Sequence, residues 1–161
     1  MVKRNSLLLL LVFMTLMSCK KETFYDSYQR VDGAWSKDDV KSFEVTQEDT
    51  LSTYNLFLNI RNNKEYAFSN LFVIVKVEQP NEIVWVDTLE YQMAEPDGTL
   101  LGTGFSDVKE NKLWIKEGYV FPVKGDYTFK VEQVVREIGD VEGVELLKGI
   151  SEIGIQIEKT K

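Results

Sequence analysis

Apolar and polar residues alternate along most of the chain beyond residue 40. In one run the apolar positions are Tyr54, Leu56, Leu58 and Ile60, with mostly polar residues between them. A period of two indicates a β-strand with one face turned to a core. The runs with this period are 42–47, 54–61, 71–78, 83–93, 113–117, 127–135 and 153–157.

Turn-forming sequences separate several of these runs. They are Asn62-Asn63-Lys64, Gln79-Pro80-Asn81, Pro96-Asp97-Gly98 and Lys124-Gly125-Asp126. Beyond residue 18, no stretch keeps a helical period for three turns. The pattern predicts an all-β fold, a single antiparallel β-sandwich over residues 40–161. We expect about seven or eight strands in an immunoglobulin-like or jelly-roll-like arrangement. The sequence entering Tyr127 also predicts a tyrosine corner, in which the phenol hydroxyl bonds to the chain upstream.

The first 18 residues have the three parts of a secretory signal. Lys3 and Arg4 precede an apolar run from residue 7 to 17, and a small residue, Ser18, stands before Cys19. As a helix that run would rise only about 16 Å, against roughly 30 Å for the hydrocarbon core of a bilayer. Residues 1–18 are therefore predicted to be a signal peptide rather than a membrane-spanning helix.

Cys19 is the predicted site of lipidation. The sequence Leu-Met-Ser-Cys at 16–19 resembles the lipobox of bacterial lipoproteins, which implies that Cys19 becomes the acylated first residue. It is the only cysteine, so no internal disulfide can form, and acylation removes a free thiol from an oxidising compartment. The alternative is an ordinary secreted protein. Residues 19–39 are expected to be a lipidated tether and lead-in that begins to dock at Phe24, Tyr25 and Trp35. The expected location is the cell envelope, in the outer membrane, with the periplasmic or surface face left open.

The charge of the mature chain argues against nucleic acid as a partner. The leader holds two of the 19 basic residues and no acid, so 17 basic and 26 acidic residues remain, a net charge of −9. Such a surface repels phosphate backbones.

Few residues offer chemistry. The chain has no histidine, and no nucleotide-binding or nucleophile-elbow motif is present. We therefore predict no catalytic residue, no metal and no cofactor. A calcium site from Asp97, Asp107, Glu110 and Asn111 is a weak alternative, because the spacing matches no EF-hand loop.

Asp87 stands out because it shares the apolar phase of its run. An inward-pointing acid needs a partner, unless a bulge shifts the register. We expect a structural ion pair with Arg61 or Arg136.

Aromatic and aliphatic residues on the polar phase predict a contact surface. Phe57, Phe72 and Ile74 lie at such positions, and we interpret them as a protein-partner surface. Burial under a loop is the competing explanation. Trp35 and Trp114 belong to a wider aromatic set that would suit a glycan-binding platform if exposed.

Several segments, taken in order and spacing, resemble the GldH gliding-motility lipoprotein family of Bacteroidetes. They are 54–62 (YNLFLNIRN), 66–71 (YAFSNL), 85–90 (WVDTLE), 98, 101–104 (LGTG), 122, 125–129 (GDYTF), 135–136, 149–150 and 153–154. The resemblance extends from about residue 25 to 158 and departs from the family pattern at 105–108.

The resemblance implies a lipoprotein associated with gliding motility and the linked type IX secretion apparatus. It implies no enzymatic activity and carries over no catalytic residues. The leading hypothesis is a non-enzymatic protein that binds the bilayer through acylated Cys19 and contacts other envelope proteins. The alternatives are a surface glycan-binding lipoprotein that uses exposed aromatic residues and, last, a glycosidase with two carboxylates.

Overall fold

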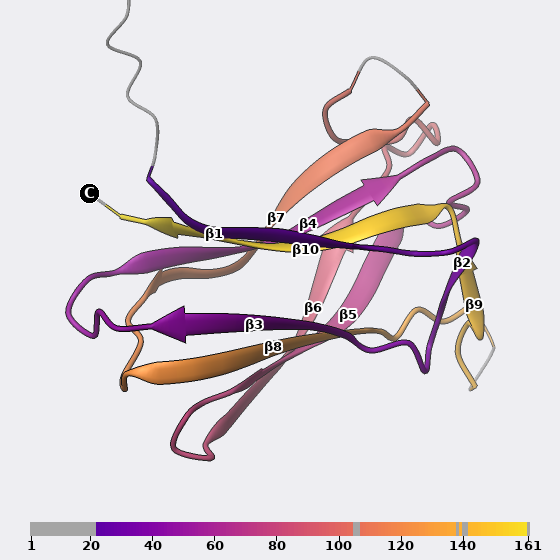
Figure 1. Cartoon of the computed structure of the whole chain (residues 1–161). Coiled ribbons are helices and arrows are strands. Elements are labelled where there is room, and N and C mark those ends of the chain that lie inside the picture. The colour runs from indigo at the N-terminus through magenta and orange to yellow at the C-terminus, as the bar shows by residue number, and fades with distance from the viewer. Residues whose placement is uncertain (1–21, 105–106, 138, 140–141, 161) are drawn as a thin grey trace, which may run out of the picture.

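The computed structural model describes residues 22–104, 107–137, 139 and 142–160, and these form two packed β-sheets (Figure 1). Ten strands are present in this part of the chain and no helix, so it contains no helix able to cross a membrane. The strands are β1 (Thr23–Arg30), β2 (Ala34–Ser36), β3 (Lys41–Gln47), β4 (Tyr54–Asn62), β5 (Asn70–Glu78), β6 (Val84–Gln92), β7 (Lys109–Tyr119), β8 (Gly125–Gln133), β9 (Leu146–Lys148) and β10 (Ile150–Lys159). The all-β antiparallel sandwich predicted from the sequence is confirmed.

Each of the two main sheets contains four antiparallel strands. Sheet 1 has the order β1-β10-β4-β7, and sheet 2 has the order β3-β8-β5-β6. Strands β2 and β9 form a separate two-stranded pair. Of the connections between the long strands, only β5–β6 stays within one sheet, so the chain passes repeatedly from one layer to the other.

The core lies between the two sheets and follows the predicted alternation. Leu56, Leu58 and Ile60 of β4 are fully buried, and they face the likewise buried Val73 and Val75 of β5. The tyrosine corner is also present. The hydroxyl of Tyr127 donates to the carbonyl oxygen of Val123 at 2.6 Å.

Strand β1 extends the sheet further towards the N-terminus than the sequence pattern indicated. Thr23 pairs with Glu158, and the register continues to Arg30 opposite Glu152. Most of the segment expected to be a tether and lead-in, residues 19–39, is therefore part of the sandwich, which begins at Thr23 rather than at residue 40. Cys19 and the signal peptide lie outside the described residues.

The two ends of the sandwich differ in the length of their connections. One end, which we call the Thr23 end, holds the start of β1, the end of β10 and the short turns 48–53, 79–83 and 120–124. The opposite end, the Arg30 end, holds the longer connections 31–40, 63–69, 93–108 and 134–149. In Figure 1 the C-terminus and the start of β1 lie at the left, whereas β2 and β9 lie at the right.

Gly149 fixes a close backbone contact at the Arg30 end. Its φ is +83°, and a Cβ at this position would lie 2.1 Å from the amide nitrogen of Tyr66. The Tyr66 hydroxyl in turn donates to the carbonyl oxygen of Asn70 at 2.8 Å, which closes the β4–β5 connection.

Candidate functional site

Phe72 and Ile74, two of the three residues expected to form a partner surface, lie side by side on the outer face of sheet 2. Both belong to β5 and are half-buried. Their neighbours in sequence point the other way, into the core. Val84 and Val86 of β6 share this face and are 52% and 53% exposed. We call these four residues the β5–β6 face.

Two ion pairs border the β5–β6 face. Lys76 pairs with Glu132, and Lys130 pairs with Glu78, each across neighbouring strands of sheet 2. An apolar centre with a charged border is the usual composition of a protein-binding surface.

Phe57 does not belong to this surface. It is only 3% exposed and lies on the outer face of sheet 1, the opposite side of the sandwich. The Trp114 ring packs against it at 4.4 Å between centroids, and the Lys112 ammonium lies 4.1 Å from its centroid. The expectation that Phe57 is exposed beside Phe72 and Ile74 is therefore wrong, because side chains of β7 cover it.

The three tryptophans have different environments and form no line of exposed rings. Trp35 is fully buried, with its indole nitrogen donating to the carbonyl oxygen of Asp39 at 2.8 Å. Trp85 is half-buried, and Trp114 is 48% exposed. Trp114 is thus the one tryptophan with a large accessible ring.

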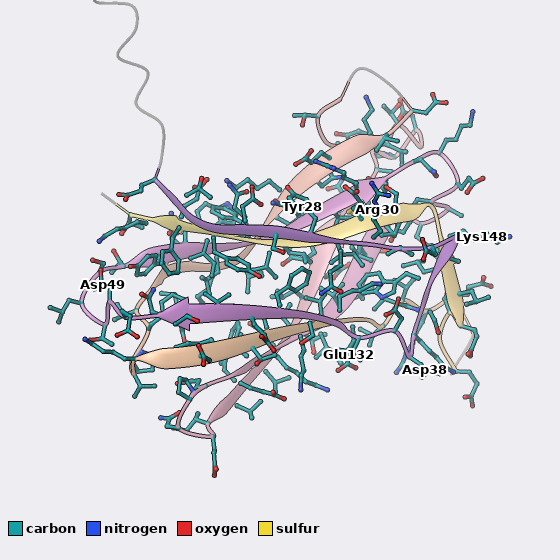
Figure 2. The ribbon with its side chains drawn as sticks, in the orientation of Figure 1. Tyr28, Arg30, Asp38, Asp49, Glu132 and Lys148 are labelled. Carbon is teal, nitrogen blue, oxygen red and sulfur yellow. The ribbon has the colours of Figure 1, made fainter. Side chains whose placement is uncertain are left out.

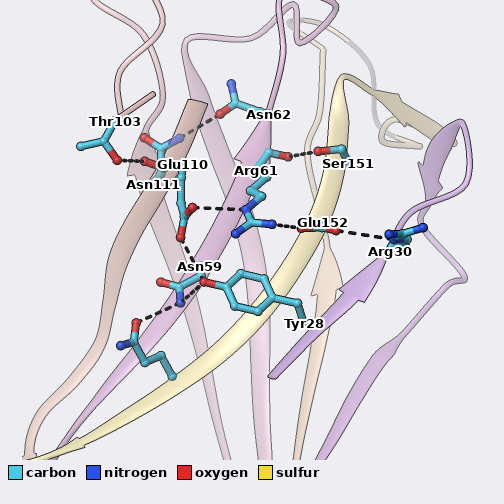
Figure 3. Close-up of polar contacts among 11 residues, drawn as sticks. Tyr28, Arg30, Asn59, Arg61, Asn62, Thr103, Glu110, Asn111, Ser151 and Glu152 are labelled. Atoms are coloured by element: carbon cyan, nitrogen blue, oxygen red, sulfur yellow. Dashed lines mark hydrogen bonds and ion pairs between the residues drawn. The ribbon is translucent and has the colours of Figure 1, made fainter. Parts of the chain in front are cut away.

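The outer face of sheet 1 carries a row of alternating charges that crosses all four strands (Figure 3). In order the row is Arg30 of β1, Glu152 of β10, Arg61 of β4 and Glu110 of β7. Arg61 donates from Nε to Glu110 at 3.2 Å and from Nη1 to Glu152, while Arg30 lies 3.7 Å from the other oxygen of Glu152. We call these four residues the charged row.

Tyr28 forms a second layer next to the charged row. Its ring crosses β10 at Gly154, where a Cβ would lie 2.7 Å from the ring, and the Arg61 guanidinium carbon stands 4.8 Å from the ring centroid. The hydroxyl donates to Glu110 at 3.0 Å and accepts from Asn59 at 2.9 Å. Burial, together with the bond to Glu110, raises the pKa of Tyr28 to about 12, so this phenol stays neutral at physiological pH.

The expected ion pair of Asp87 is not formed, because Arg61 faces the other side of the sandwich and binds Glu110 and Glu152. Asp87 is half-buried on β6, the edge strand of sheet 2, on the face that also carries Trp85. Among the described residues, no ion pair joins Asp87 to either arginine. Burial raises the pKa of Tyr91, and the negative charge of Asp87 raises it further.

Arg136 lies exposed at the Arg30 end, just beyond β8. It borders a shallow hollow of about 230 Å³, together with Lys37, Asp38 and Glu142. This hollow has charges of both signs and no strong electrostatic preference.

The residues of the calcium alternative serve separate structural roles. Asp97 accepts from the amide of Thr99 at 2.8 Å, and Glu110 belongs to the charged row. Asn111 donates to Asn62 at 2.8 Å in the interior. Within the described residues, no group of three or more His, Cys, Asp or Glu side chains is placed to hold a metal ion.

The charged row and Tyr28 were not identified from the sequence. Glu110, Glu152 and Tyr28 come from three strands separated by many residues, and only the register of β1, β10, β4 and β7 brings them together. The one available signal was the pair Arg61-Asn62 at the end of a predicted strand. Chemically, both carboxylates already accept from Arg61, which leaves an ordered polar surface rather than a free acid–base pair.

Comparison with known proteins identifies the family. A family model described as GldH lipoprotein matches residues 23–157. The gliding motility lipoprotein GldH of Flavobacterium johnsoniae is 49% identical over 156 residues, covering 97% of both chains. A gliding motility lipoprotein GldH homolog from Christiangramia forsetii is 46% identical over 143 residues, covering 89% of this chain and 88% of that protein.

Two solved structures show a weak likeness to this chain. The structure of the infectious bursal disease virus Gx strain aligns with a TM-score of 0.38 at 8% identity, over 84% of this chain and 29% of that one. The VP2 subviral particle of infectious bursal disease virus gives 0.37 at 9% identity, over 85% and 33%. Neither informs fold or function at these scores. The family match and the two near-full-length relatives show instead that this chain belongs to the GldH lipoprotein family.

Proposed function

We propose that the protein is a lipid-anchored component of the cell envelope that works in gliding motility by binding other envelope proteins. The observation that carries this proposal is the 49% identity to a gliding motility lipoprotein over 97% of both chains. The anchor is acylated Cys19, and the membrane is the outer one. Two acyl chains on a cysteine hold a protein on a bilayer, since each buried methylene contributes about 0.8 kcal/mol.

The β5–β6 face is the proposed contact surface for the protein partner. Val84 and Val86 are more than half exposed on an edge strand, and Phe72 and Ile74 continue the apolar area inward. Binding would bury this area and leave the two bordering ion pairs, Lys76–Glu132 and Lys130–Glu78, at the rim.

The arrangement on sheet 1 favours a non-enzymatic role. A two-carboxylate glycosidase needs one protonated acid and one free carboxylate about 5 to 9 Å apart in a cleft. Glu110 and Glu152 instead both accept from the Arg61 guanidinium on an open sheet face, so neither carboxylate is free to act as an acid or a base.

Affinity purification from native envelopes tests the proposed function. Tagged, lipidated protein is isolated after mild solubilisation, and co-purifying proteins are identified by mass spectrometry. We expect components of the motility or secretion apparatus, reduced at least about tenfold by Val86→Asp or Phe72→Asp, because a charge in an interface centre is strongly unfavourable. Leu146→Asp is the matched control, since Leu146 is 56% exposed on β9 and lies off the β5–β6 face.

Two results would count against the proposal. Equal recovery of the co-purifying proteins with the wild type and with the Val86→Asp variant would show that the contact surface lies elsewhere. Recovery of glycan-uptake proteins alone would instead show that the similarity to gliding motility lipoproteins reflects common ancestry and not a shared role.

Trp114 supports one alternative, a surface glycan-binding lipoprotein. Its ring is 48% exposed and is held in place by Phe57, which suits stacking on a sugar. Glycan-affinity electrophoresis with the wild type and Trp114→Ala separates the two functions. Retardation that disappears in the variant would favour glycan binding, and no retardation of either protein favours the protein-binding role.

A further inference from the structure

Each short turn at the Thr23 end carries an exposed apolar side chain. Leu51 in the β3–β4 turn is 91% exposed, Ile83 in the β5–β6 turn 55%, and Val120 in the β7–β8 turn 42%. Phe24, at the start of β1, is 40% exposed at the same end. We call these four residues the apolar tips.

The loop that presents Leu51 is held firmly by Asp49. One carboxylate oxygen of Asp49 accepts from the amides of Leu51 and Ser52, each at 3.0 Å. The other accepts from the Lys159 ammonium at 3.1 Å and from the Tyr54 hydroxyl at 3.2 Å. The loop is therefore built to hold its leucine outward in water, where an apolar side chain gains nothing.

The turns are also tied to one another. Lys124 of the β7–β8 turn lies 3.9 Å from Glu48 of the β3–β4 turn. Pro80 of the β5–β6 turn packs so close to Gly125 that a Cβ there would be 3.0 Å from the proline ring. Beneath them, consecutive aromatic rings pack at centroid distances of 4.9 to 5.4 Å; these rings are Phe24, Tyr54, Phe121 and Tyr127. The apolar tips thus belong to one rigid platform.

Two of the acidic residues at this end are paired with lysines. Its three turns contain the acidic residues Glu48, Asp49 and Glu82, and two lysines, Lys124 and Lys159, lie against the first two. The mature chain as a whole has a net charge of −9. Glu22 and Asp126 add negative charge at this end, so an attraction to a membrane has to come from the apolar tips rather than from charge.

The covalent chain restricts how far this end can lie from the bilayer. Only three residue steps separate Cys19 from Glu22, the first described residue, and they span at most about 11 Å. If Cys19 is anchored, the Thr23 end has to face the membrane at close range.

We propose that the Thr23 end docks on the bilayer, with Leu51, Ile83, Val120 and Phe24 inserted among the lipid headgroups. The inference rests on the proposed lipid anchor at Cys19 and adds a second, non-covalent contact with the same membrane. It orients the sandwich with its strands rising from the surface. The Arg30 end, with the long connections, then points away from the membrane.

Site-specific labelling of the acylated protein in vesicles tests the docking. The natural cysteine carries lipid, so an introduced cysteine supplies the only free thiol for an environment-sensitive fluorophore. The vesicles contain phosphatidylethanolamine and phosphatidylglycerol. Leu51→Cys reports on the Thr23 end, and Leu146→Cys is the matched control, an exposed leucine on β9. Figure 2 shows the corresponding ends, marked by Asp49 and by Lys148 of β9.

We expect the label at position 51 to emit at shorter wavelength and to be quenched by aqueous iodide about threefold less than the label at 146, because it lies among headgroups. High salt should leave this difference unchanged, since the contact is apolar. Equal quenching at both positions would overturn the docking, and so would a difference that disappears in high salt.

A flotation assay separates the docking from the anchor. Acylated protein that floats with vesicles but shows equal quenching retains the anchor and refutes the docking. Protein that does not float refutes the anchor, and the docking with it.

Discussion

Two glycines with nearly the same backbone conformation have very different surroundings. Gly33 and Gly149 have φ values of +78° and +83°. A Cβ on Gly33 would meet nothing within 4 Å, whereas one on Gly149 would overlap the backbone of Glu65 and Tyr66. The pair therefore separates the energetic cost of the left-handed conformation from the cost of close approach.

We expect Gly33→Ala to lower the free energy of unfolding by about 1 to 2 kcal/mol, the cost of a left-handed alanine. Gly149→Ala should lower it by about 1 to 3 kcal/mol more, because the backbone at Tyr66 has to move. Urea denaturation of both variants measures the difference. Equal losses would mean that the contact at Tyr66 relaxes without cost.

Asp49 makes the stability of the fold depend on pH. Bonds from the Ser52 hydroxyl, from the Leu51 and Ser52 amides and from Lys159 hold the pKa of Asp49 well below its ordinary value. A carboxyl whose pKa is lower in the folded state stabilises the fold above its unfolded pKa, about 3.9, and loses that contribution as the pH falls further. The difference in unfolding free energy between wild type and Asp49→Asn should therefore shrink between pH 6 and pH 2. A difference that stays constant would show that the charge of Asp49 is not involved.

The sequence alone could assign side chains to a face but not their exposure. The alternation correctly separated Phe57 from the core-facing Leu56 and Leu58. The burial of Phe57 depends on Lys112 and Trp114, and the register between β4 and β7 brings these side chains over its ring. The same holds for Arg61, whose acidic partners Glu110 and Glu152 belong to β7 and β10.

At the scale of single strands, β6 is an exposed edge that has to avoid pairing with other chains. It is nine residues long without proline or glycine, and Val84 and Val86 are exposed on it. An inward-pointing charge is one way in which natural edge strands prevent such pairing, and Asp87 is such a charge. This explains an acid in the apolar phase of the strand without an ion-pair partner.

Asp87→Val should therefore promote self-association through β6. We expect a shift from monomer towards dimer and larger species in sedimentation velocity, with unfolding free energy unchanged or higher, since the substitution removes a half-buried charge. Thr88→Val is the control, because it adds an apolar residue to the outer face and keeps Asp87. A monomeric Asp87→Val variant at all concentrations would refute the role in edge protection.

The long central strands were predictable, and the first strand was not. β5 buries alternate residues, and β4 and β10 place alternate apolar residues in the core, so this period is visible in the sequence. β1 (TFYDSYQR) lies at the edge of sheet 1 and is at most half-buried, so its composition shows little apolar alternation. Its strand conformation comes from pairing with β10, more than a hundred residues away in sequence.

At the scale of the whole molecule, the Thr23 end of the sandwich has short turns and the Arg30 end has long connections. The turns 48–53, 79–83 and 120–124 are short, while the Arg30 end carries every long connection and the β2–β9 pair. If the Thr23 end faces the lipid, the Arg30 end points away from the membrane, and the proposed β5–β6 contact face lies on the side of the sandwich between these two ends.

The position of β10 inside sheet 1 also has a consequence for the timing of folding. This strand lies between β1 and β4, although it is synthesised after every other strand that the structure describes. Until its residues arrive, β1 has no neighbour and the sheet is divided in two. Sheet 1 therefore cannot close until the residues of β10 are available for pairing. Pairing between the ends of a chain is also slow, which lengthens this interval.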